Sequence, residues 1–208
     1  MTERILAALD ALYPFDGRCF LHYQKDQPWQ LLVATILSAQ CTDERVNQVT
    51  AQLFQKYPSL EALAASSYEA LAEDVRSTGF FRMKAKHIQE SARLLLQRHQ
   101  GQLPSDIAVL TALPGVGRKT ANVVRGHIFG IPSIVVDTHV KRVSYRLGLT
   151  RHKDPEKIEF ELMQTLPQDH WIPYNQQVIT HGRRVCTARK PQCQGCALAE
   201  FCDLGRPC

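Results

Sequence analysis

The sequence lacks any apolar run that approaches the length of a membrane span. The longest such run, around Leu31–Leu37, is short, whereas a spanning helix needs about 20 predominantly apolar residues. The opening segment, Met1–Asp10, carries Glu3 and Arg4, and its apolar stretch stops at the last of these ten residues. It therefore lacks the apolar core of a signal peptide. These absences predict a cytoplasmic protein with no membrane partner, in a compartment that keeps thiols reduced.

Strand-forming runs, low-complexity segments and repeats of fixed period are also lacking. The only strand-like run, Ile134–Val136, is too short to build a sheet. Apolar residues instead recur at helical spacing, most clearly within 29–37, 46–57 and 81–95, and Pro and Gly punctuate the segments between them. We therefore predict an all-α architecture of about ten short helices. At 208 residues and 44% hydrophobic, the chain can form one domain or two small ones with a real core.

Four of the seven cysteines form a C-x6-C-x2-C-x5-C array near the end of the chain, at Cys186, Cys193, Cys196 and Cys202. In a reducing compartment such an array argues for metal binding rather than disulfides. Thiolates suit zinc or an iron–sulfur cluster. Zinc usually takes two separated C-x2-C pairs, so the single pair here favours a compact cluster wrapped by one loop. Four unrelated cysteines form the competing interpretation, which the tight spacing disfavours.

A hairpin is predicted at Leu113–Gly117, between two helical segments. Gly115 and Gly117 permit a tight turn and a close backbone approach to a ligand. The turn opens onto a helix expected over Arg118–Phe129, whose free amides and dipole suit a phosphate oxygen. The net charge of +5 is compatible with a polyanionic partner. With basic residues directly after the turn, we favour phosphate binding over a corner without a ligand.

Lys119 and Asp137 are the candidate reactive residues. Lys119 falls in the first turn of its helix, where the dipole disfavours an ammonium group, and a neutral lysine is a nucleophile that can form a Schiff base. A surface lysine that contacts phosphate fits its position equally well. Asp137 falls where a helix N-cap belongs, a role worth about 1 kcal/mol, and its position alone indicates nothing more.

Taken together, these residues resemble endonuclease III, the iron–sulfur branch of the helix–hairpin–helix DNA glycosylases. The resemblance runs from roughly residue 5 to 202, with the motifs in order and at family spacing. Cys41 stands where the family commonly has a small residue such as Ala. Besides the cysteine array, the matching segments are Leu113–Val124, Val136–His139, Leu37–Asp43, His181–Cys186 and Ala188–Pro191.

The resemblance implies a helix–hairpin–helix DNA glycosylase fold, with two helical lobes and a DNA-binding groove between them. One lobe is a six-helix barrel over residues 22–132 that carries the hairpin. The other joins residues 1–21 to 133–208 and holds a [4Fe-4S] cluster. The resemblance makes Lys119 the catalytic nucleophile and Asp137 its acidic partner. It makes the four cysteines of the array the cluster ligands.

The resemblance also implies a set of DNA contacts. Gln40 matches the residue that fills the gap left by an extruded base, and Phe80 falls near a second wedge position that is often Leu. The remaining expected contacts lie in the hairpin and in the loop of the cysteine array, and comprise Gly115, Val116, Gly117, Arg118, Arg189 and Lys190.

The activity implied is that of a bifunctional DNA glycosylase and AP lyase of base excision repair. Such an enzyme acts as a monomer on double-stranded damaged DNA in the cytoplasm, in association with the nucleoid. It removes oxidised pyrimidines and cleaves 3′ to the abasic site by β-elimination through a lysine Schiff base.

Three other functions are compatible with parts of the sequence. The adenine-removing mismatch glycosylase shares the hairpin and the array, but it usually lacks a lysine at the position of Lys119 and has a further C-terminal recognition domain. A non-catalytic helix–hairpin–helix DNA-binding module would need neither Lys119 nor Asp137. A zinc-stabilised scaffold would be colourless. Outside the array, we expect Cys19 and Cys41 to be small buried apolar residues and Cys208 to be an exposed terminal thiol.

Overall fold

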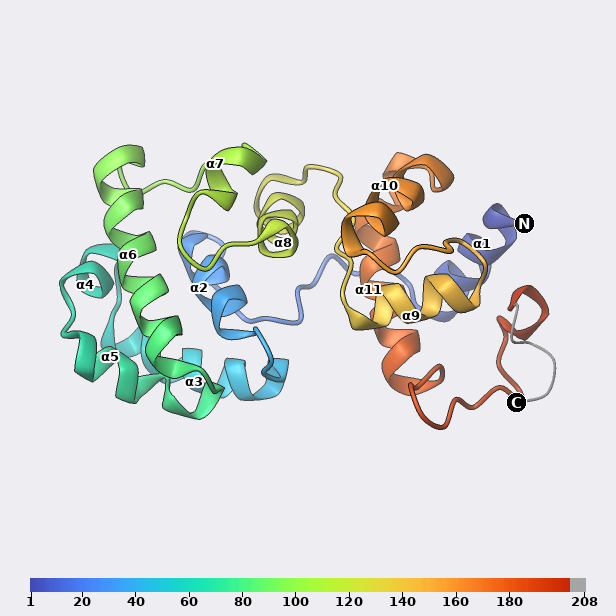
Figure 1. Ribbon diagram of the computed structural model, residues 1–208, viewed down its shortest axis with the longest axis horizontal. Helices are drawn as coiled ribbons and strands as arrows, with labels where there is room; N and C mark the ends of the chain where they lie inside the picture. The colour runs from blue at the N-terminus through green and yellow to red at the C-terminus, as the bar shows by residue number, and fades with distance from the viewer. Residues whose placement is uncertain (203–208) are drawn as a thin grey trace. The chain divides into compact units, whose positions relative to one another are not determined.

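A computed structural model describes residues 1–202 of the chain (Figure 1). Cys208, with its predicted terminal thiol, lies outside the described residues. The chain divides into two compact units. The central unit is Cys19–Gly130, and the terminal unit combines Met1–Arg18 with the chain from Ile131 onward. The family resemblance places the corresponding boundaries at residues 22 and 132.

The central unit is built around one buried helix, α2 (Trp29–Leu37). All nine of its residues are buried, and only Gln30 and Thr35 among them are polar. Its one buried hydroxyl, on Thr35, donates to the Leu31 carbonyl at 2.7 Å. The surrounding elements are α3 (Asp43–Lys56), α4 (Leu60–Ala65), α5 (Tyr68–Asp74), the 3-10 turn η1 (Arg76–Thr78), α6 (Phe81–His99), α7 (Ile107–Thr111) and α8 (Arg118–Phe129). Helices α3, α6 and α8 contact α2 directly.

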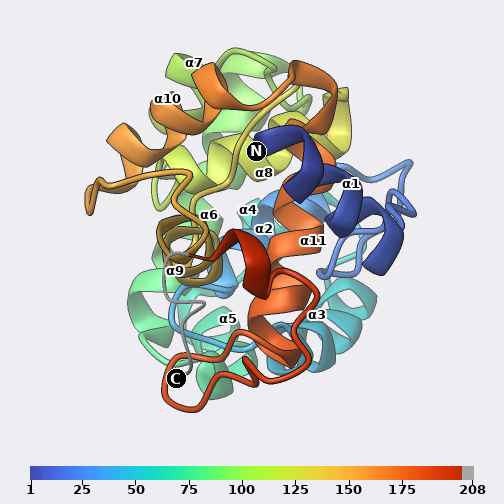
Figure 2. The ribbon, with the colours of Figure 1, turned by 90° about the vertical axis from the view of Figure 1, so that its right-hand side faces the viewer.

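The terminal unit is organised along α11 (Trp171–Arg184), which contacts both α1 (Thr2–Leu12) and α9 (Thr138–Arg146) (Figure 2). Its other elements are α10 (Pro155–Thr165) and the 3-10 turns η2 (Gln168–His170) and η3 (Ala199–Phe201). The two ends of the described chain share one core. This core is formed by fully buried side chains that include Ile5, Leu9, Val140, Ile158, Leu162, Tyr174 and Val178.

The predicted all-α class is confirmed, since residues 1–202 form helices and no strand. The helix expected over Arg118–Phe129 has those bounds, and the stripes within 29–37, 46–57 and 81–95 lie on α2, α3 and α6. The apolar run Ile134–Val136 has no regular secondary structure, with Ile134 and Val135 buried and Val136 half-buried. Asn175 accepts from the Val135 amide at 2.9 Å and donates to the Ser133 carbonyl at 3.0 Å, in place of a strand partner. None of the described helices is both long and apolar enough to cross a membrane.

Cys19 and Cys41 are half-buried at the margin of the central core, rather than fully buried as expected. Burial raises the pKa of the Cys19 thiol to about 11. A thiol with a raised pKa is a poor nucleophile at neutral pH, which agrees with a packing role for Cys19.

Candidate metal centre and nucleic-acid interface

The hairpin connects α7 to α8 and is braced from the side by α6. The Ser91 hydroxyl on α6 donates to the Pro114 carbonyl at 2.9 Å. Gly115 has φ +76°, and a Cβ atom built on it would lie 2.6 Å from His87 Nδ1 and 2.9 Å from His87 Cβ. The turn therefore needs glycine for two reasons, its left-handed backbone and its close approach to α6. This packing fixes the direction in which α8 leaves the turn.

The start of α8 presents main-chain amides and basic side chains together. Its N-cap is Gly117, in an extended conformation with φ −88°, and a glycine has no side chain to cap the first amides. Lys119 is exposed in the first turn and Arg118 is half-buried. Val116 is only 5% exposed and packs into the central core. Of the predicted hairpin contacts, Val116 can therefore offer a ligand its main chain but not its side chain.

Gly115→Ala and Gly117→Ala should differ in their effect on the stability of the hairpin. At Gly115 the methyl group meets His87 and a left-handed backbone, so we expect the free energy of unfolding to fall by about 2 kcal/mol. At Gly117 the backbone is ordinary and no atom lies within 4 Å of the new Cβ, so we expect a loss below about 1 kcal/mol. Urea unfolding of the two variants measures the difference. Equal losses would contradict the bracing by α6.

Gln40 and Phe80 have a backbone conformation that is unusual for residues other than glycine. Among the described residues, three non-glycine residues have positive φ, namely Gln40 (54°), Phe80 (48°) and Gln100 (54°). Gln100 ends α6, where a left-handed residue is common. The other two lie in the loops after α2 and η1, and both are exposed, Phe80 by 69%. An exposed ring on a strained backbone indicates a functional position.

Asp137 caps α9, as its position in the sequence predicts. Its Oδ1 atom accepts from the main-chain amides of His139 at 2.8 Å and Val140 at 2.7 Å. Both bonds are made to the same carboxylate oxygen. The cap therefore does not need Oδ2, so a structural role and a chemical role can coexist in this half-buried side chain. Lys119 and Asp137 belong to different units.

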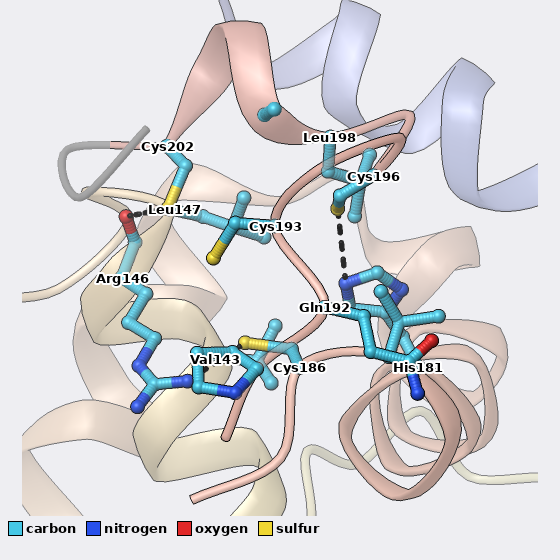
Figure 3. Close-up of a pocket in the computed structure, with 13 residues that line it drawn as sticks. Val143, Arg146, Leu147, His181, Cys186, Gln192, Cys193, Cys196, Leu198 and Cys202 are labelled. Atoms are coloured by element: carbon cyan, nitrogen blue, oxygen red, sulfur yellow. Dashed lines mark hydrogen bonds between the residues drawn. The ribbon is translucent and has the colours of Figure 1, made fainter. Parts of the chain in front are cut away.

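The four cysteines of the array line one cavity in the terminal unit, between α9, the end of α11 and the segment that ends with η3 (Figure 3). The other lining groups are largely apolar and include Val143, Leu147 and Leu198. The cavity volume is about 40 Å³, several times what one water molecule needs. Within residues 1–202, no three His, Cys, Asp or Glu side chains converge closely enough to hold a single metal ion. Four thiols around one cavity form a donor set that suits an iron–sulfur cluster.

Arginines of α9 hold the start of the cysteine loop. Arg146 Nη1 lies 3.2 Å from Cys186 Sγ and also donates to the Thr187 carbonyl at 2.9 Å. Arg142 donates to the carbonyls of Gly182 at 2.9 Å and Cys186 at 3.1 Å. A guanidinium group beside a thiolate offsets part of its negative charge. These contacts support the assignment of the array as an anionic ligand set.

A buried histidine links the array to the first helix. His181 is 3% exposed, and burial lowers its pKa, which favours the neutral ring. Its Nε2 lies 3.8 Å from Cys196 Sγ, and its Nδ1 lies 3.0 Å from the Tyr13 hydroxyl. Burial and the nearby Cys196 raise the pKa of Tyr13, so its hydroxyl remains a donor. The tautomer that suits a ligating Cys196 thiolate therefore carries its proton on Nε2 and accepts from Tyr13.

The sequence could not show the partners of His181, because Tyr13 and Cys196 lie 168 and 15 residues away from it.

The sequence does show the basic residues in the loop of the cysteine array. Arg189 and Lys190 are exposed there, as are Arg183 and Arg184 at the end of α11. The terminal unit thus presents a cluster of cations beside the cysteine cavity.

Comparison with known proteins agrees with both parts of this site. Residues 33–168 match the HhH-GPD superfamily of base excision DNA repair proteins, and residues 186–202 match the iron-sulfur binding domain of endonuclease III. The chain is 54% identical over 202 residues to endonuclease III of Synechocystis sp., covering 97% of this chain and 91% of the relative. It is 46% identical over 180 residues to endonuclease III of Bacillus subtilis, covering 86% and 82%. A solved structure of a trapped endonuclease III–DNA covalent intermediate, an estranged-adenine complex, matches with a TM-score of 0.91 at 42% identity, covering 99% of this chain and 97% of that one.

The fold and the site therefore define a helix–hairpin–helix protein of base excision DNA repair. Within that class, the chain belongs to the endonuclease III family. It is an enzyme, a DNA glycosylase and AP lyase, and its cofactor is a [4Fe-4S] cluster. Cys186, Cys193, Cys196 and Cys202 line the cavity that fits this cluster.

Proposed function

We propose that the protein removes oxidised pyrimidines from duplex DNA and cleaves the strand through a covalent intermediate on Lys119. The observation that carries this proposal is the exposed amine of Lys119 at the start of α8, directly after a hairpin that offers amides to phosphate. A hairpin of this kind positions the protein on the DNA backbone without contacts that depend on the base sequence. It therefore suits an enzyme that must find damage in any sequence context.

In the proposed reaction, the damaged base first leaves the stack, which costs less than for a normal base because damaged bases pair and stack poorly. Gln40 and Phe80 fill the space that it leaves. The neutral amine of Lys119 then attacks C1′, the glycosidic bond breaks, and the base departs with the bonding electrons and takes up a proton. The sugar ring opens to an imine. Loss of a C2′ proton drives cleavage of the C3′–O bond, and water finally hydrolyses the imine and releases Lys119.

Asp137 supports this reaction through its charge. As the sugar loses the base, positive charge develops on it, and a carboxylate stabilises that charge as in glycoside hydrolysis. The same group can accept the proton that Lys119 must lose. Cys186, Cys193, Cys196 and Cys202 would hold the cluster, which would supply no reacting atom in this scheme because neither step transfers an electron. With the four cysteines anchored in this way, the loop that carries Arg189 and Lys190 would be held for contact with phosphates.

Asp137→Asn and Asp137→Ala should distinguish the contribution of Asp137 to helix stability from its contribution to catalysis. Asparagine caps a helix about as well as aspartate, so Asp137→Asn should keep the free energy of unfolding while turnover falls about 10²-fold or more. Asp137→Ala should lose the same activity and about 1 kcal/mol of stability. Single-turnover base release and urea unfolding provide the two measurements. Near-normal turnover of Asp137→Asn would leave Asp137 as a helix cap alone.

The lesion class is tested by base release from matched duplexes that each contain one modified site. We expect thymine glycol to be released and undamaged thymine to be retained. Duplexes with a pyrimidine dimer or a mismatched adenine complete the set. Release of adenine in preference to thymine glycol would overturn the proposed substrate in favour of the mismatch glycosylase activity. Binding without release of any base would indicate a DNA-binding module.

A further inference from the structure

Lys84 on α6 is a buried cation. It lies between the loop after α2, which carries Gln40, and the loop after η1, which carries Phe80; we call these the two gap loops. It is 4% exposed, and its ammonium group donates to the Leu37 carbonyl at 2.8 Å and to the Thr78 carbonyl at 2.7 Å. Burial lowers its pKa, and the nearby Cys41 thiol opposes this shift. Lysine is almost never fully buried unless it has strong partners. The two carbonyls supply them, so the position requires this ammonium group.

Both acceptors are the ends of helical segments. Leu37 is the last residue of α2, and Thr78 is the last residue of η1. Carbonyls at such ends have no partner within their own helix, and the negative end of the dipole attracts a cation. Helical side chains lean toward the N-terminus of their helix, so Lys84, in the first turn of α6, reaches back to both ends. One ammonium group thus caps two segments that are distant in the sequence.

Each capped carbonyl lies only two or three residues before one of the proposed gap residues. Gln40 follows Leu37 by three residues and Phe80 follows Thr78 by two. Both gap residues have the left-handed backbone described above, which persists only where the surrounding structure holds it. The two loops are further closed by main-chain bonds, from Cys41 to Ser38 at 3.1 Å and from Lys84 to Phe80 at 3.1 Å.

We propose that Lys84 is a positioning residue that holds Gln40 and Phe80 as one preformed pair, ready to enter the stack as the base leaves it. The inference rests on the proposed function, in which these two residues fill the gap. Without the ammonium group, the loops lose their common anchor, and the pair must be ordered during each extrusion event. Ordering the two gap residues during base extrusion costs free energy, and a preformed pair avoids this cost.

The test compares Lys84→Met with Lys86→Met. Both remove one charge from α6, but Lys86 is exposed and reaches Glu90 at 3.9 Å. Strand cleavage is measured under single-turnover conditions at an abasic site in a duplex and in the same single strand, where there is no stack to fill. For Lys84→Met we expect the duplex rate to fall about tenfold while the single-strand rate changes less than about twofold. Lys86→Met should change both rates by the same factor. Amides 38–41 and 79–81 should exchange hydrogen faster only in Lys84→Met.

The outcomes separate this inference from the function on which it rests. If Gln40→Ala and Phe80→Ala leave the ratio of duplex to single-strand rates unchanged, the gap assignment itself fails. If they lower that ratio but Lys84→Met behaves like Lys86→Met, only the role of Lys84 is overturned. Lys84→Gln retains an amide donor, and an intermediate ratio would support the proposal if Lys84→Met does not fold. Equal losses on both substrates would reduce Lys84 to a residue that supports the fold.

Discussion

Lys119→Ala should abolish strand cleavage at abasic sites, with a loss of at least about 10³-fold, and should form no covalent adduct with DNA under borohydride. The reason is chemical, because alanine has no amine to form the imine. The same change should leave stability intact or raise it by a few tenths of a kcal/mol, since it removes a cation from the start of α8. Cleavage assays and urea unfolding measure the two effects.

Two control variants make this result specific. Lys119→Arg keeps the positive charge, but a guanidinium group is not deprotonated in proteins and cannot form an imine. It should therefore bind duplex DNA like the parent and still lack cleavage and trapping. Lys86→Ala removes an exposed lysine from α6 and should retain both activities. Cleavage by Lys119→Arg at more than about a tenth of the parent rate would exclude Lys119 as the nucleophile.

Cys193→Ala should remove the cluster and with it the order of the cysteine loop. The parent should be brown, with broad visible absorbance, and the variant should lose this colour together with its iron and sulfide. Without the cluster, the segment that contains the buried Leu198 and Phe201 loses its covalent anchor. Arg189 and Lys190 are then no longer held for phosphates. We expect DNA affinity to fall at least about tenfold. The slope of log affinity against log salt concentration should become shallower, by an amount that corresponds to the loss of up to about two phosphate contacts.

Cys41→Ala is the matched control for this loss. Cys41 is half-buried like Cys193 but lies in the central unit, outside the array. Its variant should keep the iron, the colour and the salt dependence. A colourless parent containing zinc, or loss of colour in both variants, would contradict the assignment of the array as the ligand set.

The sequence predicts those features of the fold that depend on neighbouring residues. The bounds of α8 follow from the glycines at its start and end, and the cap of α9 follows from the preference of aspartate for that position. The four cysteines reach one cavity because they lie close together in a single loop. The apolar run Ile134–Val136 differs, because the Val135 amide donates to the Asn175 side chain, and no local pattern indicates such a contact.

The sequence does not reveal the polar contacts of the site between residues that are far apart in the chain. Lys84 adjoins the apolar stripe of α6, and a lysine there is ordinarily interpreted as a solvated edge of the helix. Its burial follows from two carbonyls, one of which lies 47 residues away in the sequence. The link from Cys196 through His181 to Tyr13 likewise joins the end of the chain to its first helix. Both arrangements require the packed unit before the partners meet.

The central claim is that Lys119 is the amine that attacks DNA. Its most direct test is borohydride trapping on a duplex with one abasic site, followed by nuclease and protease digestion and mass spectrometry of the adduct. We predict a sugar-derived mass increase on the peptide that contains Lys119, with fragment ions that place it on this residue. An adduct on the N-terminal amine or on another lysine would contradict the account.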